Sequence, residues 1–507
     1  MTLPQPASVA PASEPAAPAA PPEDLILPAE QILDITALRG RIDEEIDGLR
    51  EESAVRTAVV AALKDARNSG REAIAQALSE RPFDAPGACH AYRWLTDRII
   101  ETVFDVARHR LHPKPNPTES ERLAIFAVGG YGRGEMAPHS DVDLLFLTPY
   151  KITPWAESVI ESMLYILWDL KLKVGHSSRT VKDCLRLGAK DFTIRTAMLE
   201  NRFLSGDERL AEELDTALWD ELFKGSEKAF ITAKLDERDA RHEKQGQRYM
   251  VEPNVKEGKG GLRDLQSLFW ITKYIHHTDD TSELVRLGIF RPEEYETFVQ
   301  AERFLWAVRC HLHLAAGRAV EQLTFDMQVE VAERMGYADK GGRRAVEWFM
   351  QDYFRHATAV GDLTRIFLTS LEAEHRKDAP LLLRMLKRAP KVKDGYATVN
   401  NRLAVENDDC FLSDPLNLLR IFEEALRTGL LIHSDAMRLV KANLWRIDED
   451  MRRNPEARKL FLDLLLKHGN PERALRRMNE LGVLSAFIPE FAPIVAMMQF
   501  NMYHHYT

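Results

Sequence analysis

Two glycines, a basic residue and a pair of aspartates lie within fifteen residues of this chain, between two short apolar runs. The segment reads GGYGRGEMAPHSDVD, from Gly129 to Asp143. It follows the apolar run LAIFAV (123–128) and leads into VDLLFL (142–147). Short apolar runs bounded by turn residues are typical of buried strands. The segment therefore predicts a small sheet with polar residues at the ends of its strands.

The residues of this segment suit a nucleoside triphosphate and its metal ions. Gly129 and Gly130 allow a tight turn in which backbone N–H groups approach phosphate oxygens. Asp141 and Asp143 are two residues apart, so on a strand they project from the same face and converge. Two carboxylates this close repel each other unless a cation lies between them, and magnesium prefers such oxygen ligands. Ser140 could donate its hydroxyl to a phosphate.

The same segment contains Arg133, which would add a positive charge near the phosphates. An Asp-x-Asp pair alone would equally suit the solvated beginning of a strand. The glycine pair upstream, Ser140 directly before the first aspartate and the apolar runs on both sides favour the metal–nucleotide interpretation.

Most of the remaining sequence is predicted to be helical. Apolar residues recur at spacings of three and four from Ile35 to His112, and 155–170 returns to that pattern. Residues 171–180 are predicted to form a third strand. The predicted fold class is therefore α+β, with a small mixed sheet embedded in a much larger helical protein.

Composition excludes several classes of protein. The net charge of -10 and pI of about 5.9 argue against a general nucleic-acid-binding protein. No apolar run reaches the roughly 20 residues that cross a bilayer, and the N-terminus does not have the pattern of a signal peptide. The four cysteines are far apart in sequence and form no CxxC pair. This usage argues against a structural zinc site or a disulfide framework and predicts a cytoplasmic protein.

A second glycine-rich segment, EPNVKEGKGGLRD, precedes a helix predicted to begin near Leu262. Lys256, Lys259 and Arg263 surround the N-terminus of that helix, where an anion is favoured. The segment is either a second wall of the nucleotide or partner site, or a connector with solvated lysines.

Together these motifs resemble a known family. The GG…SDxD signature is similar to that of the DNA polymerase beta-like nucleotidyltransferase superfamily. Within it, GGYGRGEMAPHSDVDLLFL resembles the bifunctional PII uridylyltransferase/uridylyl-removing enzymes, which act in bacterial nitrogen signalling. Three later segments, 167–184, 249–270 and 304–328, support the narrower resemblance.

The resemblance implies a transferase domain of the polymerase beta type. It implies that UMP is moved from UTP to a tyrosine of the signal protein PII, that pyrophosphate is released, and that Mg2+ (or Mn2+) is required. A tyrosine hydroxyl has a pKa of about 10, so a metal ion would help to activate it. The site residues carried over are, for the metal and catalysis, Asp141 and Asp143, and, for the nucleotide, Gly129, Gly130, Arg133, Ser140, Lys256 and Arg263.

Related transferases often have a third carboxylate on a later strand, but the predicted strand LKVGHSSRT contains no acid. Glu200 and Glu252 are the candidates for this role. His311 and His313 are two residues apart on a predicted helix, so they do not share a face and are not expected to bind one metal ion.

The family also implies a division of the chain and an expectation about its extent. Its last segment resembles the lead-in to the family's HD domain, which removes UMP from PII, so we expect the transferase half of a longer enzyme without that domain's metal ligands or the glutamine-sensing ACT domains. The predicted regions are a disordered Pro/Ala-rich tail (1–30), an N-terminal helical region (31–115), the nucleotidyltransferase domain (116–250), a helical uridylyltransferase-type region (251–480) and the beginning of a truncated HD domain (481–507).

Other functions remain open at this stage. A related group joins the same transferase domain to CBS and cyclic-nucleotide-binding modules. A transferase acting on RNA is disfavoured by the acidic composition. A non-catalytic nucleotide-binding regulator is disfavoured because both Asp141 and Asp143 are present.

Overall fold

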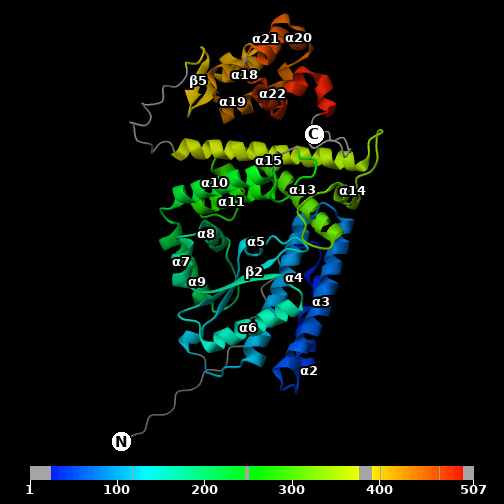
Figure 1. Cartoon of the computed structure of the whole chain (residues 1–507), viewed down its shortest axis with the longest axis vertical. Coiled ribbons are helices and arrows are strands. Elements are labelled where there is room, and N and C mark those ends of the chain that lie inside the picture. The colour runs from blue at the N-terminus through cyan, green and yellow to red at the C-terminus, as the bar shows by residue number, and fades with distance from the viewer. Residues whose placement is uncertain are drawn as a thin grey trace.

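A computed structural model of the chain describes residues 24–116, 118–245, 250–375, 391–399, 401–467 and 469–494. A small mixed sheet lies in the middle of a mostly helical molecule (Figure 1). The α+β fold class predicted from the sequence is confirmed. A second, smaller sheet lies in the C-terminal part of the chain, which the sequence pattern did not predict.

The central sheet has four strands in the order β3-β2-β1-β4. β1 pairs antiparallel with β2 and with β4, whereas β2 pairs parallel with β3. The three predicted strands are confirmed, and β4, a five-residue strand that ends in glycine, was missed. The strands are β1 (Ala124–Ala127), β2 (Val142–Thr148), β3 (Val174–Thr180) and β4 (Arg202–Gly206).

The two faces of the sheet belong to different hydrophobic cores, as the alternation of side chains along a strand requires. Val142 and Leu144 join a core shared with the N-terminal helices and the helical region that follows the sheet. Leu145 and Leu147 join a second core beneath the helices that flank β4. The prediction that Val142 and Leu144 point into the core is confirmed. Asp143 is therefore on the face that carries Leu145 and Leu147.

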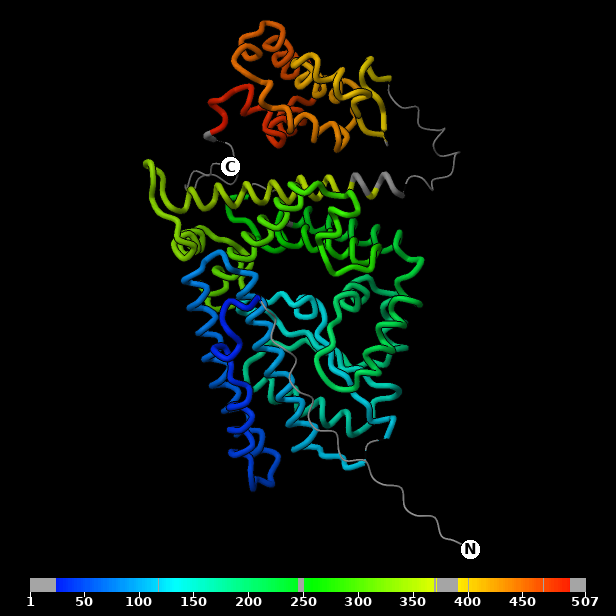
Figure 2. Tube along the Cα trace, turned by 180° about the vertical axis from the view of Figure 1, so that it is seen from behind, coloured from blue at the N-terminus to red at the C-terminus, as the bar shows by residue number. Residues whose placement is uncertain are grey.

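Long helices cover one side of the sheet (Figures 1 and 2). The predicted tail was expected to reach residue 30, but packing begins earlier. Ile26 is only 2% exposed and its N–H donates to Gly87 O at 3.1 Å, because the apolar residues 25–27 can be buried against the next helices. The N-terminal helices are α1 (Ala29–Ile32), α2 (Ile35–Ile46), α3 (Glu52–Glu80), α4 (Ala85–Val106) and a π-helical turn (Ala107–Leu111).

Shorter helices follow the strands, and a layer of longer ones lies between the sheet and the C-terminal part of the chain (Figure 1). The elements around the sheet are a 3-10 turn (Glu119–Glu121), α5 (Gly129–Gly132), α6 (Pro154–Asp169), α7 (Val181–Gly188), α8 (Phe192–Leu199), α9 (Glu208–Ala217) and a π-helical turn (Leu218–Phe223). The layer consists of α10 (Glu227–Gln245), α11 (Leu262–His276), α12 (Glu283–Arg286), α13 (Pro292–Ala316), α14 (Phe325–Arg334) and α15 (Ala345–His375).

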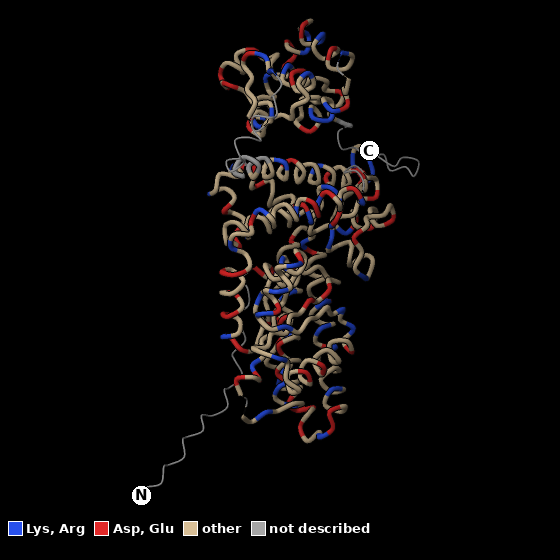
Figure 3. The backbone as a smooth tube through the Cα atoms, turned by 60° about the vertical axis from the view of Figure 1, so that its left-hand side comes forward, with Lys and Arg blue, Asp and Glu red and all other residues tan. Residues whose placement is uncertain are grey.

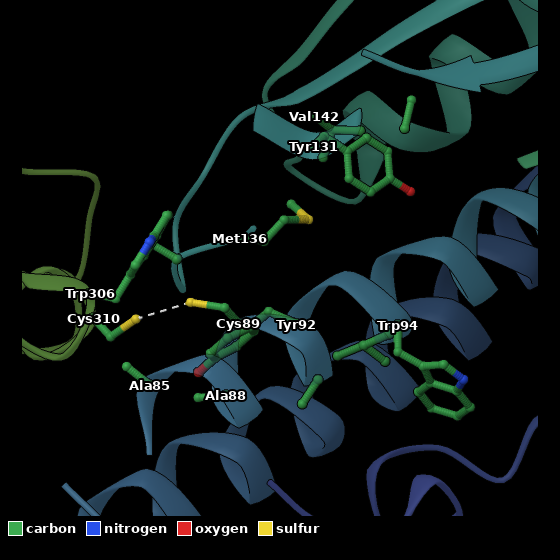
Figure 4. Packing of buried hydrophobic residues seen from close by; sticks show 14 of the residues in the cluster. Ala85, Ala88, Cys89, Tyr92, Trp94, Tyr131, Met136, Val142, Trp306 and Cys310 are labelled. Atoms are coloured by element: carbon green, nitrogen blue, oxygen red, sulfur yellow. Dashed lines mark hydrogen bonds between the residues drawn. The ribbon is translucent and has the colours of Figure 1, made fainter. Parts of the chain in front are cut away.

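α13 packs directly against α4, which joins residues more than 200 positions apart in sequence. Cys89 of α4 and Cys310 of α13 point toward each other, with their sulfur atoms 3.7 Å apart, and Trp306 lies beside them (Figure 4). All four cysteines are free thiols. Tyr131 and Met136 of the glycine-rich segment contribute to the same core. The core therefore fixes the segment between the N-terminal helices and α13.

The C-terminal part, from residue 391 onward, has its own hydrophobic core and a three-stranded sheet in the order β5-β6-β7. It contacts the helical layer through ion pairs of Arg438 with Glu294 and of Arg365 with Glu480. Its elements are β5 (Tyr396–Val399), β6 (Arg402–Val405), α17 (Asp408–Leu412), α18 (Asn417–Thr428), β7 (Leu431–Ile432), α19 (Ser434–Ala442), a 3-10 turn (Leu444–Arg446), α20 (Glu449–Arg453), α21 (Pro455–Leu466), α22 (Pro471–Glu480), α23 (Val483–Phe487) and a second 3-10 turn (Pro489–Ile494).

Charged residues of both signs are interspersed along the chain (Figure 3). None of the helices in the described ranges is both long enough and apolar enough to cross a membrane. The segment predicted to begin an HD domain is 481–507, and its last part, 495–507, lies outside the described residues.

Candidate active site

A cavity of about 370 Å³ lies between the glycine-rich segment, α8, α10, α11 and α13. It brings together residues from opposite parts of the fold, including α13, which the sequence did not link to the site. All eight residues proposed from the sequence line it: Gly129, Gly130, Arg133, Ser140, Asp141, Asp143, Lys256 and Arg263.

The side of the cavity formed by the sheet, the acidic wall, consists of Gly129, Gly130, Ser140, Asp141 and Asp143. Gly129 has a φ of +60°, a conformation that suits glycine, and a Cβ there would lie 3.4 Å from Asp143 Oδ2. The N–H of the preceding valine donates to the backbone oxygen of Asp143 at 3.0 Å. The turn and the carboxylate are thus packed directly against each other.

Asp143 is also in close contact with the neighbouring strand. A Cβ at Gly175 of β3 would collide with Asp143 Oδ1, so a side chain at that position would displace the carboxylate. This requirement could not be predicted from the sequence, because Gly175 lies outside the motif and its contact depends on the β2–β3 register.

The electrostatics of the acidic wall suit a divalent cation. Burial raises the pKa of Asp143, and the neighbouring charge of Asp141 raises it further. Lys173 lies 4.0 Å from Asp141 in an exposed pair, which is a weak contact. Across the described ranges, no group of three or more His, Cys, Asp or Glu residues is arranged to hold a metal ion. The two aspartates fit magnesium, which commonly takes one or two protein carboxylates together with substrate phosphates.

The glycine-rich turn is tied to α4 through a buried polar cluster. Tyr131 donates its hydroxyl hydrogen to Asp97 Oδ1 at 2.8 Å, and Arg202 of β4 donates to both oxygens of Asp97 at 2.9 and 3.0 Å. At the other end of the segment, Ser140 Oγ accepts from the N–H of Ala137 at 3.0 Å. These contacts hold the turn in place relative to the sheet.

Arg133 lines the cavity, but two carboxylates already neutralise its charge. Its Nε donates to Glu135 at 2.6 Å, and its guanidinium also pairs with Glu200. Glu200, which is only 4% exposed, further accepts from Trp270 Nε1. This geometry does not support the predicted role of Arg133 as a free cation for phosphate. It gives Arg133 a structural role in holding Glu200 beneath the cavity.

Neither candidate for a third carboxylate presents a free carboxylate beside the two aspartates. Glu200 lines the cavity with its Oε1 engaged by Arg133 and Trp270. Glu252 does not line it, because its Oε1 accepts from the N–H of Phe325 at 2.9 Å at the beginning of α14. The structure therefore leaves Glu252 as a helix-capping residue.

The opposite side of the cavity, the basic wall, consists of Lys256, Arg263, Arg309 and His313. In the described part of the chain, the Lys256 ammonium has neither an ion pair nor a hydrogen bond. Burial lowers the pKa of Lys256, and the charges of Arg309 and Arg263 lower it further. Lys256 in turn lowers the pKa of Asp143, which places the two charges near each other across the cavity.

The two arginine side chains of the basic wall, unlike Lys256, are paired with acidic residues. Arg263 donates to Glu257 Oε1 and to Gln266. Arg309 donates through Nε to both oxygens of Glu321 at 3.0 Å, and through its terminal nitrogen to Oε1 at 2.6 Å. Burial raises the pKa of Glu321, but His313 and Arg309 lower it to about 2.

The sequence reasoning missed Arg309, His313 and Glu321. The spacing of Arg309 and His313 could have indicated that they belong together, because residues four apart lie on one face of a helix. His311 projects elsewhere and bonds to Pro82 O at 2.9 Å, which agrees with the expectation that the two histidines do not share a face. Lys259 is exposed and does not line the cavity.

Comparison with known proteins identifies the family. A family model described as GlnD PII-uridylyltransferase matches residues 229–368, and one described as the third domain of the uridylyltransferase GlnD matches 396–487. A curated protein of Ruegeria pomeroyi is 68% identical over 476 residues, which cover 94% of this chain and 52% of that protein. This chain belongs to the GlnD uridylyltransferase family.

A second GlnD relative, from Cereibacter sphaeroides, is 62% identical over 504 residues, which cover 98% of this chain and 54% of that protein. Both relatives are named bifunctional uridylyltransferase/uridylyl-removing enzyme. This chain spans about half the length of the curated relatives it matches. The residues of the basic wall all lie within 229–368, the range that the GlnD PII-uridylyltransferase model matches.

Proposed function

We propose that this chain transfers UMP from UTP to a tyrosine of the signal protein PII, with release of pyrophosphate and a requirement for magnesium. The observation that supports this most strongly is the cavity in which two aspartates, one of them only weakly paired, face a lysine that has no ion pair among the described residues. Membership of the GlnD family supports UTP and PII as the substrates. The cysteine usage supports a cytoplasmic reaction.

In this reaction the tyrosine oxygen forms a bond to the α-phosphorus of UTP, and the bond from that phosphorus to the bridging oxygen of pyrophosphate breaks. Asp141 and Asp143 are the residues that would hold magnesium, which when bound supplies positive charge to the reacting phosphates. The turn at Gly129 and Gly130 allows close approach of the triphosphate to backbone N–H groups. Lys256 lines the same cavity and offers a charge that forms no ion pair within the described ranges.

Positioning and charge neutralisation account for most of the expected catalysis. The chain holds Asp143 against two glycine positions, and the basic wall is braced by Glu257 and Glu321. The acidic wall and Arg263 are therefore in place before the nucleotide arrives, which is the condition for electrostatic stabilisation without reorganisation.

The test is to incubate the chain with α-labelled UTP or ATP, magnesium, PII and 2-oxoglutarate, and to measure label on PII. We expect transfer from UTP that is lost in Asp141→Asn and Asp143→Asn and kept in the exposed control Asp215→Asn. Omission of magnesium should also abolish transfer. Failure to label PII from either nucleotide would contradict the proposal.

A further inference from the structure

His313 of α13 is fully buried, yet it lines the nucleotide cavity. Its Nδ1 accepts from the backbone N–H of His139 at 3.4 Å. A backbone amide can only donate, so Nδ1 carries no hydrogen. A ring without a hydrogen on Nδ1 is neutral, and burial, which lowers the pKa of His313, acts in the same direction. The single ring hydrogen is therefore on Nε2, and that atom is a donor.

This donor has no hydrogen-bond acceptor in the described part of the chain. Glu321 Oε1 lies 3.7 Å away, too far for a hydrogen bond, and both Glu321 oxygens already accept from Arg309. A buried N–H without an acceptor destabilises a folded protein, so such a group calls for an explanation. A ligand oxygen would satisfy it.

The charges around the ring indicate which kind of oxygen that is. Arg309 and Lys256 act on the ring and lower the pKa of His313, whereas Glu321, whose carboxylate is already paired with Arg309, raises it. The Lys256 ammonium also lacks a partner among the described residues. A neutral donor between two cations favours an anion over a neutral hydroxyl. The more highly charged end of a nucleoside triphosphate fits this surrounding best.

We propose that Nε2–H of His313 donates to an oxygen of the β- or γ-phosphate of the bound triphosphate, the part that leaves as pyrophosphate. The proposal rests on the proposed function and deepens it. Because the ring has no exposed surface, the oxygen reaches Nε2 when the Glu321 side chain turns aside. Glu321 stands on the loop after α13, whose helix ends at Gly317, so its side chain can move without moving the helix.

His313 then connects the phosphate to the acidic wall. His139, whose N–H it accepts, directly precedes Ser140 and Asp141. The same ring thus binds the leaving group on one side and holds the backbone that leads to the aspartates on the other. This arrangement makes His313 a positioning residue for the segment as well as a ligand of the nucleotide.

Two substitutions separate these roles. In His313→Asn the side-chain oxygen lies where Nδ1 was, so the bond from His139 is kept and the Nε2 donor is lost. In His313→Gln the amide nitrogen lies near the position of Nε2, so the donor is kept and the acceptor for His139 is lost. Calorimetric titration with inorganic pyrophosphate and with UMP, both with magnesium, measures the effect, and urea denaturation checks that each variant folds.

We expect His313→Asn to weaken pyrophosphate binding about tenfold, with UMP binding unchanged, because one hydrogen bond to a charged group is lost. His313→Gln should bind pyrophosphate more tightly than His313→Asn. Equal pyrophosphate affinity in wild type and His313→Asn would overturn the inference. So would an equal loss in both variants, or a His313→Asn variant whose only defect is a raised KM for PII.

These outcomes differ from those that test the function itself. If the wild type labels PII and His313→Asn binds pyrophosphate normally, the inference fails and the proposed function stands. If pyrophosphate binding depends on Nε2 but UTP gives no label on PII, the phosphate site stands and the proposed function fails.

Discussion

The two walls of the cavity differ in how the chain builds them. The acidic wall comes from one continuous segment, 129–143, in which local turn and strand geometry place the glycines beside the aspartates. The basic wall comes from a loop, from α11 and from α13, over residues 256–313. The first is set by local chain geometry, whereas the second exists only because a loop and two helices pack in one arrangement.

The walls also differ in their internal pairing. Among the described residues, Asp141 and Asp143 have no strong cationic partner. In the basic wall, Lys256 is the charged side chain that forms no ion pair within those residues. Arg263 and Arg309 are braced by acids. The difference indicates that the acidic wall and Lys256 are prepared for ligands, while the arginines give the basic wall its shape.

The largest effect should follow from a change behind the acidic wall that replaces no charged residue. In Gly175→Ala, the new Cβ collides with Asp143 Oδ1 and displaces the carboxylate. We expect UMP transfer to fall by about a hundredfold, as for loss of a preorganised charged group in an active site. Gly40→Ala is the control, because a Cβ there meets nothing within 4 Å. Normal transfer by Gly175→Ala would show that the position of Asp143 does not limit the reaction.

A substitution of Arg133 tests whether this cation binds the nucleotide or stabilises the fold. Arg133→Gln leaves Glu135 and Glu200 without their partner, and breaking a buried ion pair costs about 3 kcal/mol of unfolding free energy. Urea denaturation measures this loss. The exposed pair of Arg186 and Asp183 supplies the control Arg186→Gln, which should cost less than about 1 kcal/mol.

An Arg133→Gln variant with unchanged stability and weaker UTP binding would reverse that assignment. It would place Arg133 among the phosphate ligands, as the sequence alone predicted.

Lys256 is the cation of the basic wall that should matter most for the nucleotide. Lys256→Met keeps the length of the side chain and removes the charge, so the dissociation constant for UTP should rise about tenfold. Lys259→Met, in the same loop but exposed, should bind UTP as the wild type does. If both variants lose affinity equally, the loop acts through its general charge and not through the contact of Lys256 with the cavity.

The smallest effect concerns the pH dependence of stability. The pKa of Glu321 is lowered from 4.5 to about 2 in the folded chain, so its pairing stabilises the fold fully above pH 4.5 and is lost as the pH falls from there toward 2. Glu321→Gln should therefore show a shallower fall of the urea midpoint below pH 4.5 than the wild type. Identical slopes would show that Arg309 does not hold this carboxylate ionised.

The same contrast between local and long-range construction explains what the sequence could predict. Gly129, Gly130, Asp141 and Asp143 are close in the chain, so strand geometry alone brought them together. The helix that begins at Leu262 was also predicted, because its glycines and apolar spacing are local signals.

Features that depend on tertiary packing were missed. The partners of Arg133, the contact of Gly175 with Asp143 and the bond from His139 to His313 all join segments that are adjacent only in the folded chain. β4 and the second sheet were missed because their strands are two to five residues long, too short for a clear period.

The most direct test of the two-wall account is a crystal structure of the chain with magnesium and a UTP analogue that cannot be cleaved between the α- and β-phosphates. The account predicts that the triphosphate lies between Asp143 and Lys256, with the metal on the two aspartates. A nucleotide bound outside this cavity, or one that contacts only one of the two walls, would contradict it.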